Sequence, residues 1–297
     1  MGWFDFLKNN KKQDAEKASA GNKNPLLDSV EIKPGITIAR AFADEWAVIE
    51  QTRLSYVSIK ATPIETMKLE QSKFGHYPKL PAGFAYPKGE AGDYLYPLAQ
   101  INFKEVPALP GYPSSGLLQF YISVHDDVFG IDFENNQSQK NFRVLYFEEH
   151  EVENHQTDFS FLQEVMKMDT SPVYKPHALS FSVNEEFIGL GDVRYENTGS
   201  RIIQQIIDKH PGIKEELEES LYDEFSSGGH KIGGYAFFTQ EDPRLDDEIK
   251  QDYIVLLQID SDDEIMWGDS GVANFFIHPD DLAKKDFSKV MYNWDCT

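Results

Sequence analysis

The chain has 297 residues, a formal net charge of −22 and a single cysteine, Cys296. Its length allows one large domain or two ordinary ones with a full hydrophobic core. The lone cysteine excludes an internal disulfide framework and a cysteine-rich zinc module, and the negative charge argues against a protein that binds duplex nucleic acid, because such a protein needs a basic face to displace counterions.

Residues 1–25 are predicted to form an arm that precedes the folded body. The arm carries aromatic residues beside lysines, but it lacks the apolar stretch and the cleavage site of a secretory signal. No stretch of the sequence approaches the ~20 apolar residues of a membrane-spanning helix. We therefore expect a soluble, cytoplasmic protein without stable membrane association. Two roles of the arm stay open, namely docking on the protein's own body and a weak contact with a membrane or a partner.

The body begins with a short predicted helix at 44–51, and predicted β-strands follow it. In one of these strands Leu118, Phe120 and Ile122 lie on one side and polar residues alternate with them. This period of two is typical of a strand with one buried face. Turns rich in proline and glycine separate the predicted strands.

Helical patterns come next in the chain. Isoleucines and leucines at helical spacing follow Ser200, which we interpret as a helix cap, and they indicate two helices that cover one face or edge of the β body. No low-complexity linker interrupts the sequence. We expect 26–297 to form one compact domain, with a helical insertion at about 158–226. The helices predicted in this part of the chain lie at 158–168, at 202–207 following Ser200, and at 213–225.

Four blocks of the first half recur in the same order in the second half. The first block reads SKFGHYP in one copy and HKIGGYA in the other. Such self-similarity predicts an ancient tandem duplication, with repeats at about 72–147 and 230–293. Since one copy cannot bury its inner face alone, the sequence predicts a mainly β, roll-like body built from two repeats with a few covering helices. The paired blocks are 72–78 with 230–236, 98–102 with 256–260, 116–126 with 271–281, and 142–147 with 288–293.

Motifs in these blocks, among them YPLAQINFKEVP, HKIGGYAFFTQEDPR and the terminal YNWDC, are similar to those of the YwqG-like (DUF1963) family. The resemblance covers roughly residues 70–297 and implies a mainly β, roll-like fold in a bacterial cytoplasmic protein. It implies no catalytic residues, because the family has no assigned function. Its members are often encoded near secreted-toxin and immunity loci. His76 replaces the second glycine of the family's first repeat, so a side-chain-free loop is expected at Gly233 and Gly234.

A lysine and a glutamine recur at matching positions of the two repeats. The lysines are Lys73 and Lys231, and the glutamines are Gln100 and Gln258. Each type has two interpretations: the lysine contacts an anionic ligand or pairs with a carboxylate, and the glutamine contacts a ligand in a cleft or fixes buried backbone turns. The candidate ligand-binding residues are Lys73, Gln100, Lys231, Gly233, Gly234, Arg244, Gln258 and Trp267.

No motif indicates a catalytic residue or a cofactor. GDSG at 268–271 lacks the flanking residues of a serine protease, and the spacings of the P-loop and of GxGxxG are absent. Asp260, Asp262 and Glu264 are the weak candidates for a metal site. Counted from Asp260, they lack the glycine and the final carboxylate of an EF-hand loop. We therefore expect no catalytic residue, no cofactor and no firm metal site.

Charge gives the strongest indication of function. Residues 126–153 carry a net charge of −6, and residues 241–264 carry −8. An acidic surface speeds the capture of a basic protein and repels nucleic acid. We expect a non-enzymatic protein-binding module, in its sharpest form an immunity-type inhibitor of a basic toxin. The alternative is a small-molecule or metal-ion binding protein, or an enzyme, with a cleft between the repeats on which the recurring lysines and glutamines converge.

Overall fold

The computed structural model describes residues 24–245 and 247–297, so almost all of the predicted arm lies outside the described residues. Ten strands form one antiparallel sheet in the order β12-β11-β10-β9-β3-β8-β4-β5-β6-β7. Their bounds are β3 (Leu54–Pro63), β4 (Lys73–Phe74), β5 (Tyr96–Asn102), β6 (Leu117–Ile122), β7 (Phe142–Phe147), β8 (His177–Glu186), β9 (Lys231–Gly233), β10 (Ile254–Asp260), β11 (Val272–Ile277) and β12 (Met291–Asp295).

The strand order is symmetrical about the central pair β3–β8. The group β4–β7 lies on one side of this pair and the group β9–β12 on the other, and each group holds the four recurring sequence blocks in chain order. β3 pairs with β9, and β8 pairs with β4. Each half of the chain therefore places its first strand against the other half's group. A tandem duplication with exchanged first strands would give this order, and the duplication itself stays a prediction.

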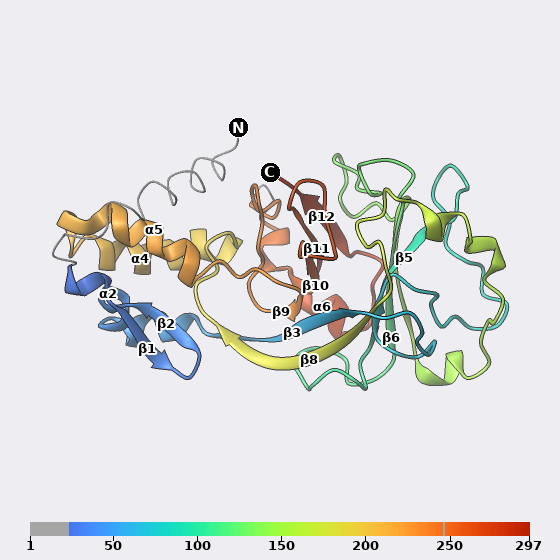
Figure 1. Cartoon of the computed structure of the whole chain (residues 1–297), viewed down its shortest axis with the longest axis horizontal. Helices are drawn as coiled ribbons and strands as arrows, with labels where there is room; N and C mark the ends of the chain where they lie inside the picture. The colour runs from blue at the N-terminus through green and yellow to red at the C-terminus, as the bar shows by residue number, and fades with distance from the viewer. Residues whose placement is uncertain (1–23, 246) are drawn as a thin grey trace.

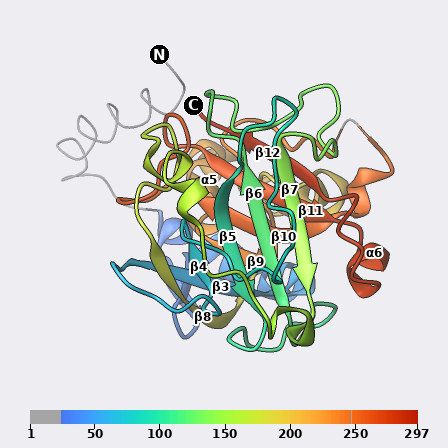
Figure 2. The same ribbon diagram turned by 90° about the vertical axis from the view of Figure 1, so that its right-hand side faces the viewer.

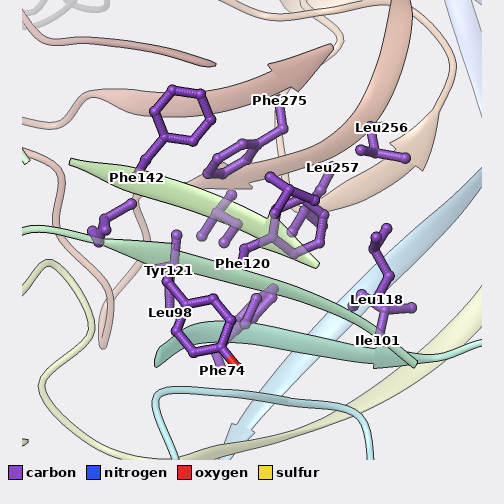
Figure 3. Close-up of a cluster of buried hydrophobic side chains, with 14 of the residues drawn as sticks. Phe74, Leu98, Ile101, Leu118, Phe120, Tyr121, Phe142, Leu256, Leu257 and Phe275 are labelled. Carbon is purple, nitrogen blue, oxygen red and sulfur yellow. The ribbon is translucent and has the colours of Figure 1, made fainter. Parts of the chain in front are cut away.

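The sheet curls so that β5–β7 face β10–β12 across one hydrophobic core (Figure 2). The ring centroids of Phe120 and Phe275 are 4.7 Å apart, and those of Phe142 and Tyr292 are 5.2 Å apart. Figure 3 shows Phe120 and Phe142 beside Phe275 in this core. Burial of one such side chain contributes about 1.5–3 kcal/mol. The predicted mainly β, roll-like body is confirmed.

The strands β6 and β11 differ from their predicted half-buried pattern. All six residues of each strand are buried. The second face of β6 is covered because Gln119 donates to the carbonyl of Lys79 and Tyr121 packs edge-on against Tyr86. One face of β6 therefore packs on the hydrophobic core, and its other face lies against a buried polar layer and not against solvent.

A second hydrophobic cluster surrounds Phe42, Ile207 and Leu217 at one end of the β3–β8 pair. We call residues 24–53 and 187–225 the helical lobe. The lobe lies to the left of the β body in Figure 1, and β3 and β8 connect the two. No helix among residues 24–245 and 247–297 is long and apolar enough to cross a membrane. The lobe contains β1 (Ser29–Lys33), β2 (Ile36–Ala39), α2 (Arg40–Ala43), α3 (Trp46–Ile49), α4 (Ser200–Ile207) and α5 (Lys214–Glu224).

The predicted helices at 202–207 and 213–225 are present as α4 and α5. A π-helical turn, Tyr195–Gly199, precedes α4, so Ser200 lies inside a helical run and does not cap it. The segment predicted as a helical insertion also contains the strand β8. The helix predicted at 44–51 is shorter, because α3 ends at Ile49 and a 3₁₀ turn follows.

The helix predicted at 158–168 is wrong. This segment holds two separate 3₁₀ turns, Ser160–Leu162 and Val165–Lys167. Its buried residues are Phe159, Leu162 and Val165, a spacing of three that suits the three residues per turn of a 3₁₀ helix. The one further α-helix of the β body in the described ranges is α6 (Pro279–Ala283), which the side chain of His278 caps.

Candidate functional site

Gln100 fixes two backbone turns from inside the first β group. Its Nε2 donates to the carbonyls of Leu69 and Gln71 at 2.7 and 3.0 Å, and its Oε1 accepts the N–H of Lys79 at 2.9 Å. The residue is 1% exposed. Both ends of the amide are thus hydrogen-bonded inside the protein, which is the usual state of a structural polar group.

Gln258 does the same in the second group. Its Nε2 donates to the carbonyls of Ser227 and Gly229 at 3.1 and 2.8 Å, and its Oε1 accepts the N–H of Phe237 at 2.8 Å. The partners stand at the same sequence distances from Gln258 as those of Gln100 do from it. The two glutamines are therefore equivalent parts of two similar scaffolds.

Lys73 ends among backbone carbonyls. Its Nζ donates to the carbonyl oxygens of Lys68, Leu69 and Tyr77 at 3.1, 2.8 and 3.1 Å. The residue is 1% exposed. In its protonated form the amino group has three N–H donors, so these bonds use all of them and leave none for a ligand.

Burial lowers the pKa of Lys73 to about 7, although Glu70 and Glu105 oppose the shift. Between pH 7 and 10.5 the unfolded chain holds up to one proton more at this residue than the folded chain does. This residue therefore makes the free energy of unfolding of the wild type rise with pH, by at most about 1.4 kcal/mol per pH unit. Lys73→Met is expected to abolish this contribution. Urea unfolding from pH 7 to 10 measures it, with the exposed Lys60→Met as the control that retains the wild-type slope. Equal slopes for wild type and Lys73→Met would contradict the prediction.

Lys231 pairs with a carboxylate. Its Nζ lies 2.8 Å from Oε2 of Glu186, and Oε1 of Glu186 accepts the N–H of Tyr235 at 2.5 Å. A Cβ on residue 234 would lie 1.9 Å from this Oε1, so only Gly234 leaves room for the carboxylate. The residue at the matching position of the first recurring block is His76, and the matching lysine, Lys73, has carbonyl partners. Burial raises the pKa of Glu186 and lowers that of Lys231, and the ion pair opposes both shifts.

A second group of charges joins the helical lobe to the β body, and we call Asp192, Arg194, Asp242 and Arg244 the charge cluster. Arg244 Nη2 lies 2.6 Å from Asp242 and 2.9 Å from Asp192. Arg194 Nη2 donates to Asp192 at 2.7 Å and to the carbonyl of Gly234 at 2.8 Å. Burial alone would raise the pKa of Asp192, but Arg244 and Arg194 outweigh it and hold that pKa well below its usual range.

The sequence singled out Arg244 but missed Glu186, Asp192 and Arg194. Asp192 and Arg244 are 52 residues apart in the chain, and no local motif connects them. The signal that was available is the charged residues on both sides of the apolar run FIGLG in EEFIGLGDVR, since buried charges are usually paired. The members of the charge cluster bind each other and backbone groups, as structural ions do.

The remaining candidates also lie inside the scaffold. Trp267 is fully buried, and its ring centroid is 5.6 Å from that of Phe129 and 6.2 Å from that of Trp294. Gly233 has φ +76°, and a Cβ there would lie 2.9 Å from Leu109. A tight turn follows Trp267, and it contains the GDSG segment, in which Gly268 and Ser270 have positive φ.

The acidic metal candidates are each engaged elsewhere. Asp260 accepts the N–H groups of Gly229 and Ser261, and Asp262 lies 3.1 Å from Nε2 of His230. Glu264 pairs with a lysine at 2.8 Å. In the described ranges, 24–245 and 247–297, no group of three or more His, Cys, Asp or Glu side chains is placed to hold a metal ion.

Exposed charge and exposed apolar groups meet at one surface. We call residues 126–140, 240–245 and 247–253 the seam surface. Lys250 Nζ lies 3.1 Å from Oδ1 of Asn136, and Gln137 Nε2 donates to the hydroxyl of Tyr253 at 3.1 Å. The segments 126–140 and 240–253 carry net charges of −3 and −4. The exposed acids of this surface are Asp126, Asp127, Glu134, Glu241, Glu248 and Asp252.

A model of a protein family, described as a domain of unknown function, matches residues 72–296. The match includes the two β groups and omits β3. No curated protein matches the chain.

Proposed function

The chain belongs to the DUF1963 family, and from its geometry we propose that it is a non-enzymatic module that binds a basic protein in the cytoplasm. The proposal rests on which polar residues are buried and which are exposed. The recurring lysines and glutamines are buried and hydrogen-bonded within the scaffold, while exposed acids gather on the seam surface. The alternative, a cleft between the repeats, would require those four side chains to line one pocket. Each of them is instead hydrogen-bonded to protein groups next to it.

The charge sets what kind of partner the protein would capture. A net charge of −22 repels a second copy of the chain and any nucleic acid, and it steers a positively charged protein toward the surface. Electrostatic steering raises association rates mainly at low salt. The narrowest form of the proposal is an immunity-type inhibitor that binds a basic toxin.

A pull-down with the tagged, full-length protein tests the proposal. We expect basic proteins to be retained from a native lysate at low salt and released at high salt, because salt screens charges farther apart than about 10 Å at 0.1 M. Each retained protein is identified by mass spectrometry, purified and titrated against the module. The expected result is a Kd that rises at least tenfold between low and high salt. If no basic protein is retained at low salt, the proposal fails.

A further inference from the structure

We infer that the seam surface is the docking site, and that it takes a segment of a basic protein that presents apolar side chains together with lysines or arginines. This inference rests on the proposed function and adds the location and the chemistry of contact. Phe133 and Ile249 are the apolar anchors on this side of the interface.

The anchors stand out by their exposure. Ile249 is 77% exposed and Phe133 is 74% exposed, the highest values among the large exposed apolar side chains of the described residues. Leu245 on the same surface is 39% exposed. Neither anchor contributes to a hydrophobic core of the protein. Apolar side chains within a polar rim are the usual centre of a protein–protein contact.

The two segments that carry the anchors are held together before any partner arrives. Gln137 Nε2 donates to the hydroxyl of Tyr253 in the second segment at 3.1 Å. The first segment is also fixed to residues 289–292, because Gln137 Nε2 donates to the carbonyl of Lys289 at 2.7 Å and the carbonyl of Asn136 accepts the N–H of Tyr292 at 2.8 Å. Lys250 reaches across to Asn136 from the other segment. A surface that is already ordered loses less conformational entropy on binding.

The negative charge of the seam surface determines which kind of partner it can bind. The exposed acids of the seam surface face few cations, because Lys140 pairs with Glu90 at 2.9 Å and Lys250 pairs with Asp247 at 3.5 Å. A second copy of this chain would bring more negative charge to the same place. An open hollow of about 560 Å³ beside the exposed acid Glu241 has room for a long basic side chain; it is lined by Gln240, Glu241, Asp242, Pro243 and Leu245.

Two double variants test the location. Phe133→Ser with Ile249→Ser removes the anchors, and Tyr174→Ser with Val183→Ser removes two other exposed apolar side chains, 56% and 52% exposed, as the matched control. The probe is a fluorescent, helical lysine–leucine peptide, compared with a glutamate–leucine peptide of the same length. We expect the anchor variant to bind the lysine–leucine peptide at least tenfold more weakly, the control variant to change less than twofold, and the glutamate–leucine peptide not to bind.

A photo-crosslinking amino acid at position 133 or 249 then tests the site in a native lysate, with positions 174 and 183 as controls. We expect the basic proteins released by high salt to crosslink at 133 and 249 and not at the controls. Full retention of those proteins by the anchor variant, or crosslinks to a second copy or to nucleic acid, would overturn the docking site and leave the proposed function standing. Absence of any retained basic protein on the wild type would remove both. Circular dichroism and a wild-type urea midpoint establish that each variant is folded.

Discussion

Replacing Arg244 with methionine is expected to lower the free energy of unfolding by about 3–5 kcal/mol, because the carboxylate of Asp242 would stay buried without its cation and that of Asp192 would keep only Arg194. The guanidinium is fully buried and also donates to the carbonyl of Tyr253 at 2.7 Å. Methionine keeps most of the volume, so the loss measures the charge and the hydrogen bonds more than a cavity. Urea unfolding at neutral pH gives the value.

The matched control is Arg53→Met, which removes an arginine that is half exposed and paired with Glu185 at 3.1 Å. Exposed ion pairs contribute about 0–1 kcal/mol, so this variant should differ little from wild type. A triple variant that combines Arg244→Met with Asp192→Asn and Asp242→Asn should be more stable than the sum of its single losses predicts. An Arg244→Met protein within 1 kcal/mol of wild type would mean that these charges do not depend on each other.

The substitution Gly234→Ala is expected to lower the free energy of unfolding by at least about 3 kcal/mol. The left-handed φ of +76° adds about 1–2 kcal/mol for a residue with a Cβ, and the new Cβ would lie 1.9 Å from Oε1 of Glu186. The carboxylate must then move away from Lys231, which leaves a buried ammonium group without its partner. Thermal or urea unfolding measures the loss.

Gly83→Ala separates the two causes of this effect. Gly83 has a similar φ of +79°, and a Cβ there meets nothing within 4 Å. Gly83→Ala should therefore lower the free energy of unfolding only by the roughly 1–2 kcal/mol that the left-handed backbone conformation costs. Equal losses at both positions would show that the contact between residue 234 and Glu186 does not contribute.

The recurring blocks predicted the two outer groups of strands well, but not the central pair. Both β3 and β8 alternate apolar and polar residues, as in Leu179, Phe181 and Val183 of β8. That pattern was present in the sequence. It was hidden because neither strand belongs to a recurring block, and because β8 lies in a segment with helical patterns on both sides.

The candidate site was harder to predict than the fold, for a physical reason. Gln100 and Lys73 are buried by turns such as 68–71 and 76–79, whose backbone groups they bind. A sequence shows that a polar residue recurs, but burial depends on which distant loop covers it. The partners of Lys231 show the same dependence, since Glu186 is 45 residues away in the chain.

The pairing of β3 with β8 has a consequence for synthesis on the ribosome. β3 ends at Pro63, and its first partner, β8, begins at His177. At about 5–20 residues per second, β3 emerges roughly 6–23 s before β8. The strands β4–β7 can pair with each other during that interval, while β3 has no partner strand. The middle of the finished sheet therefore forms after the β4–β7 group, and a nascent chain presents Val57 and Ile59 to chaperones until β8 and β9 arrive.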